Sequence, residues 1–212
     1  MRKWVHQFVA IAICATCPLA GLAQTPKQGV YIGDEDVKAV LKHAADTKRA
    51  IPDNTIRVID MGKYQMGVAV VHRGKLESTA DAPNPGAVAN SAAACGEQRA
   101  GVKGPGGILH DDTAESYVVI SGAATLISGG AIVNGRRSAP ESEVTKVLNG
   151  PSCSGTIVGY TSRKIKTGDV IIIPEGVPHG FSEIPDHVTY LSIRPDLKKV
   201  LQHGYVNPAL TN

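Results

Sequence analysis

The spacing of apolar residues changes once along this chain of 212 residues. Between residues 34 and 45 the apolar positions recur at helical spacing, and Asp34 is placed to cap the first turn. From residue 56 onward the chain consists of short β-branched runs separated by Gly, Pro, Asn and Asp. The pattern predicts one short N-terminal helix followed by a domain that is nearly all β.

Seven runs in the β-rich part are typical of strands: residues 55–60, 64–72, 115–121, 123–128, 156–159, 169–173 and 188–194. Many short strands at even spacing indicate a sandwich or a closed barrel. Two long insertions interrupt the pattern, residues 76–107 and residues 134–162. Because long irregular segments are uncommon in compact domains unless they cover a site or move, we expect the two insertions to form one lid.

The N-terminus has the pattern of an export signal. Arg2 and Lys3 precede an apolar run over residues 8–19, and small residues at Gly21 and Ala23 favour cleavage before Gln24. The alternative is an uncleaved anchor, but the run is shorter than the roughly 20 apolar residues that span a bilayer. We therefore expect a signal peptide at residues 1–23, a helical arm at 24–54 and a β-barrel domain at 55–212, in a periplasmic or secreted protein.

Charge and composition argue against several kinds of partner. Of 22 Lys and Arg residues, Arg2 and Lys3 leave with the signal, so the rest nearly balance the 19 Asp and Glu residues. The basic excess that nucleic-acid binding needs is therefore missing. Only 4% of residues are aromatic and no long amphipathic basic helix is present, so we expect no membrane partner after cleavage.

The cysteines predict a disulfide. Cys14 and Cys17 lie in the signal, which leaves Cys95 and Cys153 to meet an oxidising compartment. One cysteine lies in each insertion, so an intramolecular bridge would join the two loops. Two free thiols or an intermolecular pair are the alternatives.

The strongest local motif runs from Gly168 to His179. An apolar strand leads into a Pro-x-Gly turn at Pro174 and Gly176, and this turn presents His179 at a fixed distance. The run resembles the second motif of the cupin superfamily, Gly-x5-Pro-x-Gly-x2-His, at every named position. Glu183 stands where the family often has Asn.

A second run resembles the first cupin motif, Gly-x5-His-x-His-x3-4-Glu-x6-Gly, in part. Counted forward from Gly104, His110 is the first histidine and Asp112 occupies the place of the second, with a short gap before Glu115. Counted back from Glu115 with the longer gap, His110 is the second histidine and Ile108 takes the first place. Either alignment keeps His110 and Glu115 as metal ligands by resemblance, with Asp112 as a further candidate.

Strand geometry supports the same site without the family. Alternate side chains of a strand share one face, so Glu115 and Tyr117 would point together into the barrel. If His110 and His179 come from neighbouring strand ends, two imidazoles and one carboxylate meet in the open arrangement of non-haem Fe(II) sites. We expect one divalent transition metal, Fe or Mn first, with Zn, Ni and Co as alternatives; a cupin scaffold that has lost its metal is the rival interpretation.

Further side chains are candidates for proton transfer. His72 ends a strand, and we expect it to enter the cavity as an acid/base group, as we do for Tyr117. Tyr190 and Arg194 on the last strand are weaker candidates. For all four residues, core or surface packing is the alternative.

The resemblance covers residues 64–194 and implies a mainly β fold, the cupin double-stranded β-helix or jelly-roll barrel, commonly a homodimer. This scaffold hosts oxygenases, isomerases, lyases, decarboxylases and binding proteins, so the fold alone does not fix the function. We predict a periplasmic or secreted metal-dependent enzyme acting on a small organic substrate. The alternative is a non-catalytic module that binds a small molecule or a metal.

Overall fold

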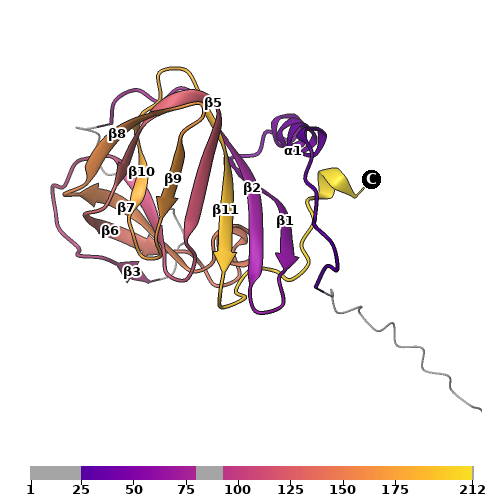
Figure 1. The fold of residues 1–212 in the computed structure, drawn as a ribbon. Helices are drawn as coiled ribbons and strands as arrows, with labels where there is room; N and C mark the ends of the chain where they lie inside the picture. Colours follow the sequence, from indigo (N-terminus) through magenta and orange to yellow (C-terminus); the bar gives the residue numbers. More distant parts are fainter. Residues whose placement is uncertain (1–24, 80–92, 212) are drawn as a thin grey trace, which may run out of the picture.

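The computed structural model describes residues 25–79 and 93–211 (Figure 1). The predicted signal peptide, residues 1–23, lies outside the described residues. Helix α1 (Asp34–Asp46) matches the predicted helix. Asp34 is not its cap, however: Gly33 is the N-cap residue, and its backbone N–H donates to the Asp36 carboxylate at 3.1 Å.

Two antiparallel sheets share one long strand, β5 (Glu115–Ser128). The first sheet has the order β1 (Asp53–Asp60), β2 (Gln65–Arg73), β11 (Val188–Asp196), β5 and β9 (Val170–Ile173). The second has the order β8 (Thr161–Lys166), β5, β10 (His179–Glu183), β4 (Gly106–His110), β7 (Ser152–Val158), β6 (Ala131–Arg137) and β3 (Ala94–Cys95).

Strand β5 changes sheets at Gly122. Its φ of 78° is open to glycine but strained for other residues, and a Cβ there would lie 2.0 Å from the backbone oxygen of His187. The first half of β5 pairs with β11 and β9, and the second half pairs with β8 and β10. The shared strand therefore brings the two sheets face to face.

The core lies between the two sheets. Tyr117 and Tyr190 from the first sheet pack in one cluster with Leu126, Ile165 and Phe181 from the second. The strand order and this enclosed core form the mainly β, double-stranded β-helix that the cupin resemblance predicts.

Helix α1 covers the outer face of the first sheet beside β1 and β2 (Figure 1). Val40 of the helix packs against Ile56 of β1 and Val70 of β2. Strand β2 is consequently apolar on both faces, one toward the barrel and one toward the helix.

The described residues of the two predicted insertions contain strands. Residues 134–162 contain the end of β6, a π-helical turn η1 (Val144–Leu148) and all of β7, so this prediction of an irregular loop is wrong. Residues 76–107 contain β3 and the start of β4, while 80–92 lie outside the described residues. Glycine and polar residues in these strands hide the alternation that marks a strand.

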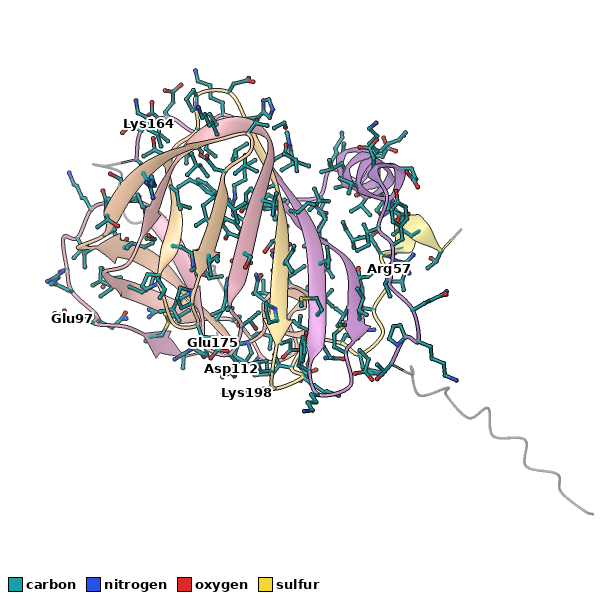
Figure 2. The ribbon with its side chains drawn as sticks, in the orientation of Figure 1. Arg57, Glu97, Asp112, Lys164, Glu175 and Lys198 are labelled. Atoms are coloured by element: carbon teal, nitrogen blue, oxygen red, sulfur yellow. A yellow bond between two sulfur atoms is a disulfide. The ribbon has the colours of Figure 1, made fainter. Side chains whose placement is uncertain are left out.

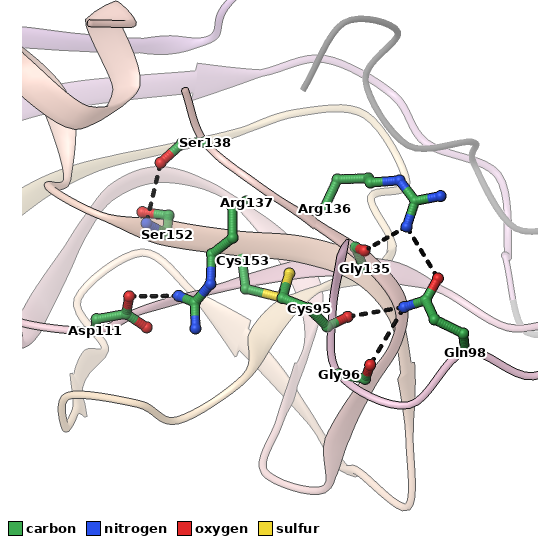
Figure 3. The surroundings of a disulfide bond; sticks show 10 residues. All are labelled: Cys95, Gly96, Gln98, Asp111, Gly135, Arg136, Arg137, Ser138, Ser152 and Cys153. Carbon is green, nitrogen blue, oxygen red and sulfur yellow. Dashed lines mark hydrogen bonds and ion pairs between the residues drawn. A yellow bond between two sulfur atoms is a disulfide. The ribbon is translucent and has the colours of Figure 1, made fainter. Parts of the chain in front are cut away.

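The predicted disulfide between Cys95 and Cys153 is confirmed (Figure 3). It joins β3 to β7 at one side of the second sheet, where Arg137 and Asp111 form an ion pair beside it. Such bridges are typical of proteins in oxidising compartments. Across the part of the chain that the structure describes, no helix has the length and apolar character needed to cross a bilayer.

Candidate metal centre

Three buried side chains from three strands converge inside the barrel. His110 ends β4, Glu115 begins β5 and His179 begins β10, and their ligand atoms lie within 4.8 Å of one another. Glu115 Oε2 lies 3.3 Å from His110 Nε2 and 3.0 Å from His179 Nε2. The structure therefore brings together the two imidazoles and the carboxylate that the motifs single out.

The Pro-x-Gly turn is tied directly to the end of β4. Gly176 has a φ of 71°, which lets the turn reverse, and its N–H donates to the backbone oxygen of His110 at 2.8 Å. His179 follows three residues later and pairs with Ile108 of β4. This bond fixes the two histidines relative to each other although 69 positions separate them in the sequence.

Hydrogen bonds determine which nitrogen of each imidazole carries the proton. His179 Nδ1 lies 2.9 Å from the carbonyl oxygen of Val177, so it is the donor. His110 Nδ1 lies 2.8 Å from Ser152 Oγ, whose own proton goes to the carbonyl oxygen of Gly150. Both Nδ1 atoms are thus protonated, and both Nε2 atoms present lone pairs in the neutral rings.

These lone pairs face a carboxylate oxygen. His179 Nε2 is buried with no hydrogen-bond partner, because its 3.0 Å contact with Glu115 Oε2 lacks hydrogen-bond geometry. Burial lowers the pKa of His110 and so favours the neutral ring, although the charge of Glu115 acts in the opposite direction. Electron-rich atoms that converge without a proton between them suit a cation, and Nδ1–H bonds of this kind orient metal-binding histidines. The side chains present therefore fit a divalent metal ion.

The other oxygen of Glu115 is held by the protein. Oε1 accepts hydrogen bonds from Arg194 Nε at 2.7 Å, Ser192 Oγ at 2.9 Å and Asn149 Nδ2 at 3.1 Å. Burial alone would raise the pKa of Glu115, but the charge of Arg194 holds it well below its usual range. The carboxylate stays ionised, with Oε2 directed at the two histidines.

Arg194 is fully buried and links the centre to β1. Its Nη2 donates to Asp53 Oδ2 at 2.6 Å, and its Nη1 donates to the carbonyl oxygen of Leu148 at 2.8 Å. Sequence reasoning singled out Arg194 only weakly and missed Asn149 and Ser192 altogether. The available signal was the pair of polar residues, Ser192 and Arg194, at alternate positions of β11 on the face that also carries Tyr190.

Tyr117 lies at the centre. Its hydroxyl donates to Glu115 Oε2 at 2.8 Å, and its ring meets the edge of His179 with centroids 6.1 Å apart. Burial and the nearby Glu115 charge raise the pKa of Tyr117 well above its usual range, so the phenol keeps its proton. The catalytic role predicted for this residue remains a prediction.

Asp112 lies outside the group of three. Its carboxylate accepts from Lys198 Nζ at the lower rim of the barrel in Figure 2, where Glu175 is also close by. The alignment counted back from Glu115 is the one that fits, because Ile108 lines the cavity beside His110. The expectation that Asp112 adds a fourth ligand is therefore wrong.

His72 does not enter the cavity. Its side chain is exposed on the outer face, where Nδ1 lies 2.8 Å from Thr189 Oγ1, whereas its neighbours Val71 and Arg73 line the interior. The prediction that His72 enters the cavity is wrong because it assigned the wrong residues of β2 to the inner face. Helix α1 covers the outer face, so that face is as apolar as the inner one.

A cavity of about 640 Å³ opens from the centre between the sheets. The candidate ligands and Tyr117 form part of its wall. Tyr190 lies further along the wall, its ring centroid 4.2 Å from that of Tyr117. Fold and site together define a cupin-type barrel with a buried centre of two histidines and one glutamate.

Comparisons with known proteins return only solved structures of low similarity. No protein-family model and no curated protein matches the chain. Among solved structures, a Klebsiella pneumoniae protein with a double-stranded β-helix domain is 17% identical over 68% of this chain and 75% of its own, with a TM-score of 0.32. A Bacillus halodurans protein is 12% identical over 85% of this chain and 90% of its own, with a TM-score of 0.36.

The Cnp3 cupin domain of Schizosaccharomyces pombe is 10% identical over 68% of this chain, with a TM-score of 0.33, and the chain spans 61% of that domain. The fold assignment rests on the strand pairing described above, and the site rests on its side-chain geometry.

Proposed function

We propose that this protein is a periplasmic or secreted metal-dependent enzyme that acts on a small organic substrate, by oxygenase, lyase or isomerase chemistry. His110, Glu115 and His179 would hold one divalent metal ion. The observation that carries the proposal is the pair of Nε2 lone pairs directed at Glu115 Oε2 in a buried site.

A metal ion bound there would supply a Lewis acid or a site of O2 activation. The chain's own residues have separate parts. Arg194, Ser192 and Asn149 hold Glu115 in one orientation through Oε1. Tyr117 keeps a proton at its hydroxyl beside the centre, where it can donate a hydrogen bond to a substrate in the cavity.

A non-catalytic binding module is the second candidate function. The favouring observation is the ion pair between Arg194 and Glu115, which compensates the carboxylate charge without a metal. In that case the cavity would hold a small molecule and the centre would serve only as a buried polar network.

Metal analysis separates the two. The full chain, purified after export without a tag, should contain about one transition-metal ion per molecule by plasma mass spectrometry. His110→Ala and His179→Ala should lose the ion while keeping the circular dichroism spectrum of the parent. His43→Ala, on the exposed face of α1, is the matched control and should keep it. Folded parent protein that stays metal-free after incubation with Fe, Mn, Zn, Ni and Co would favour the binding module.

A further inference from the structure

A second cationic group faces the cavity away from the metal centre. Arg73 is the last residue of β2 and lies on its inner face with Val71, which pairs with Tyr190 of β11. Its guanidinium carbon lies 5.5 Å from the centroid of the Phe181 ring. Phe181 is two residues beyond His179 on β10, so one molecule in the cavity can reach from Arg73 toward the centre.

The guanidinium of Arg73 has a side-chain hydrogen bond with Tyr190 but no ion-pair partner among the described residues. Within residues 25–79 and 93–211, no carboxylate lies within ion-pair distance of its guanidinium, and its buried Nε has no acceptor. Asp53 also lines the cavity, but its carboxylate is paired with Arg194. A half-buried cation without an ion-pair partner favours an anion in the cavity.

The other charged side chains that line the cavity also favour an anionic ligand. Arg194 is shared between Asp53 and Glu115, and Lys75 is paired with the exposed Glu77. One divalent ion at the centre would therefore leave the cavity with an excess of positive charge.

The surroundings of Arg73 select the type of anion. Phe181 and Tyr190 flank the guanidinium, and the apolar side chains of Leu76 and Ile184 line the same cavity. A single planar guanidinium matches the two oxygens of one carboxylate, whereas phosphate sites usually gather several donors. The aromatic and aliphatic wall suits an apolar body attached to that carboxylate.

We propose that the cavity binds a small organic carboxylate, with its carboxylate on the Arg73 guanidinium and its apolar body against Phe181 and Tyr190. The inference deepens the proposed function, on which it rests, by naming the substrate class. Arg73 is then the residue that determines specificity at the end of the cavity away from the metal.

Matched pairs of acids and amides test the proposal by titration calorimetry. Benzoate, phenylacetate and 3-phenylpropionate are compared with their primary amides on the full chain, once with Zn²⁺ and once after chelation. At least one acid should bind about tenfold more tightly than its amide, because only the acid forms a charge-assisted pair. Arg73→Gln should remove that preference, while Arg163→Gln, on exposed β8, should keep it.

The outcomes separate this proposal from the proposed function. If no acid exceeds its amide in the unmodified protein, the carboxylate site is wrong, whether or not Arg73→Gln folds. An Arg73-dependent preference in protein that takes up no metal supports the carboxylate site and overturns the metal-dependent enzyme. Stoichiometric metal without any acid preference does the reverse.

Discussion

At the scale of single residues, the two oxygens of Glu115 have different partners. Oε1 accepts three hydrogen bonds from the protein, and Oε2 faces the histidines and Tyr117. A carboxylate fixed through one oxygen presents the other in a constant position, which a ligand for a metal requires.

Arg194→Met tests how much this network contributes. The substitution leaves Glu115 and Asp53 buried without their cation, so we expect the free energy of unfolding to fall by about 3–5 kcal/mol. Urea titration followed by circular dichroism measures the loss. Arg163→Met, at an exposed position of β8, should stay within about 0.5 kcal/mol of the parent. A small loss for Arg194→Met would show that the pair contributes little.

The centre also predicts how stability depends on pH in chelated protein. The folded pKa of Glu115 is depressed, so its stabilisation is complete above the unfolded value of about 4.3 and is lost as the pH falls further. The folded pKa of His110 is also lowered, so its effect has the same sign and begins below about pH 6.5.

We therefore expect the unfolding free energy to fall steadily from pH 7 to pH 4, measured by urea titration at each pH. In the upper part of this range, the unfolding free energy of His110→Ala should depend less on pH than that of the parent, and that of His43→Ala should not differ from the parent. Parent stability that rises toward acid would contradict the assignment of neutral, buried histidines.

At the scale of elements, β2 has two buried faces and so gives no sequence signal for its orientation. Val70 packs under α1 while Val71 faces the barrel, and both are fully buried. Alternation of apolar and polar residues cannot be read where both faces are apolar, and this is why His72 was placed on the wrong side.

His72→Ala tests the corrected orientation. Because its side chain is exposed on the outer face, we expect metal content to be unchanged and stability to shift by no more than about 0.5 kcal/mol. Val40→Ala leaves a cavity beneath α1 and should lower the free energy of unfolding by about 1–3 kcal/mol in the same urea assay. Loss of metal in His72→Ala would return this residue to the centre.

Other elements differ in how far the sequence reveals them. The ligands follow from motif spacing because each sits at a strand end, and His179 also follows a Pro-x-Gly turn. Strand β4 begins with two glycines and β8 is mostly polar and exposed, so neither shows the expected alternation. Asn149 and Arg194 reach Glu115 from elements distant in sequence, so only the folded chain reveals their role.

At the scale of the whole molecule, the disulfide closes a span of 58 residues between β3 and β7. The double variant Cys95→Ser, Cys153→Ser should lose about 2–4 kcal/mol of unfolding free energy, because its unfolded chain is less restricted. Urea titration of the parent with and without dithiothreitol should show the same difference, and the reductant should leave the double variant unchanged. Equal stability of parent and double variant would mean that the bridge adds no constraint.

Cys153 is also the next residue after Ser152, which fixes the proton of His110, and Ser138 in turn holds the Ser152 backbone (Figure 3). The covalent link therefore anchors the strand that aims one of the imidazoles. A chain with reduced thiols would carry the same ligands less firmly aligned. Under the proposed function, oxidation of the two thiols would therefore come before stable retention of the metal ion.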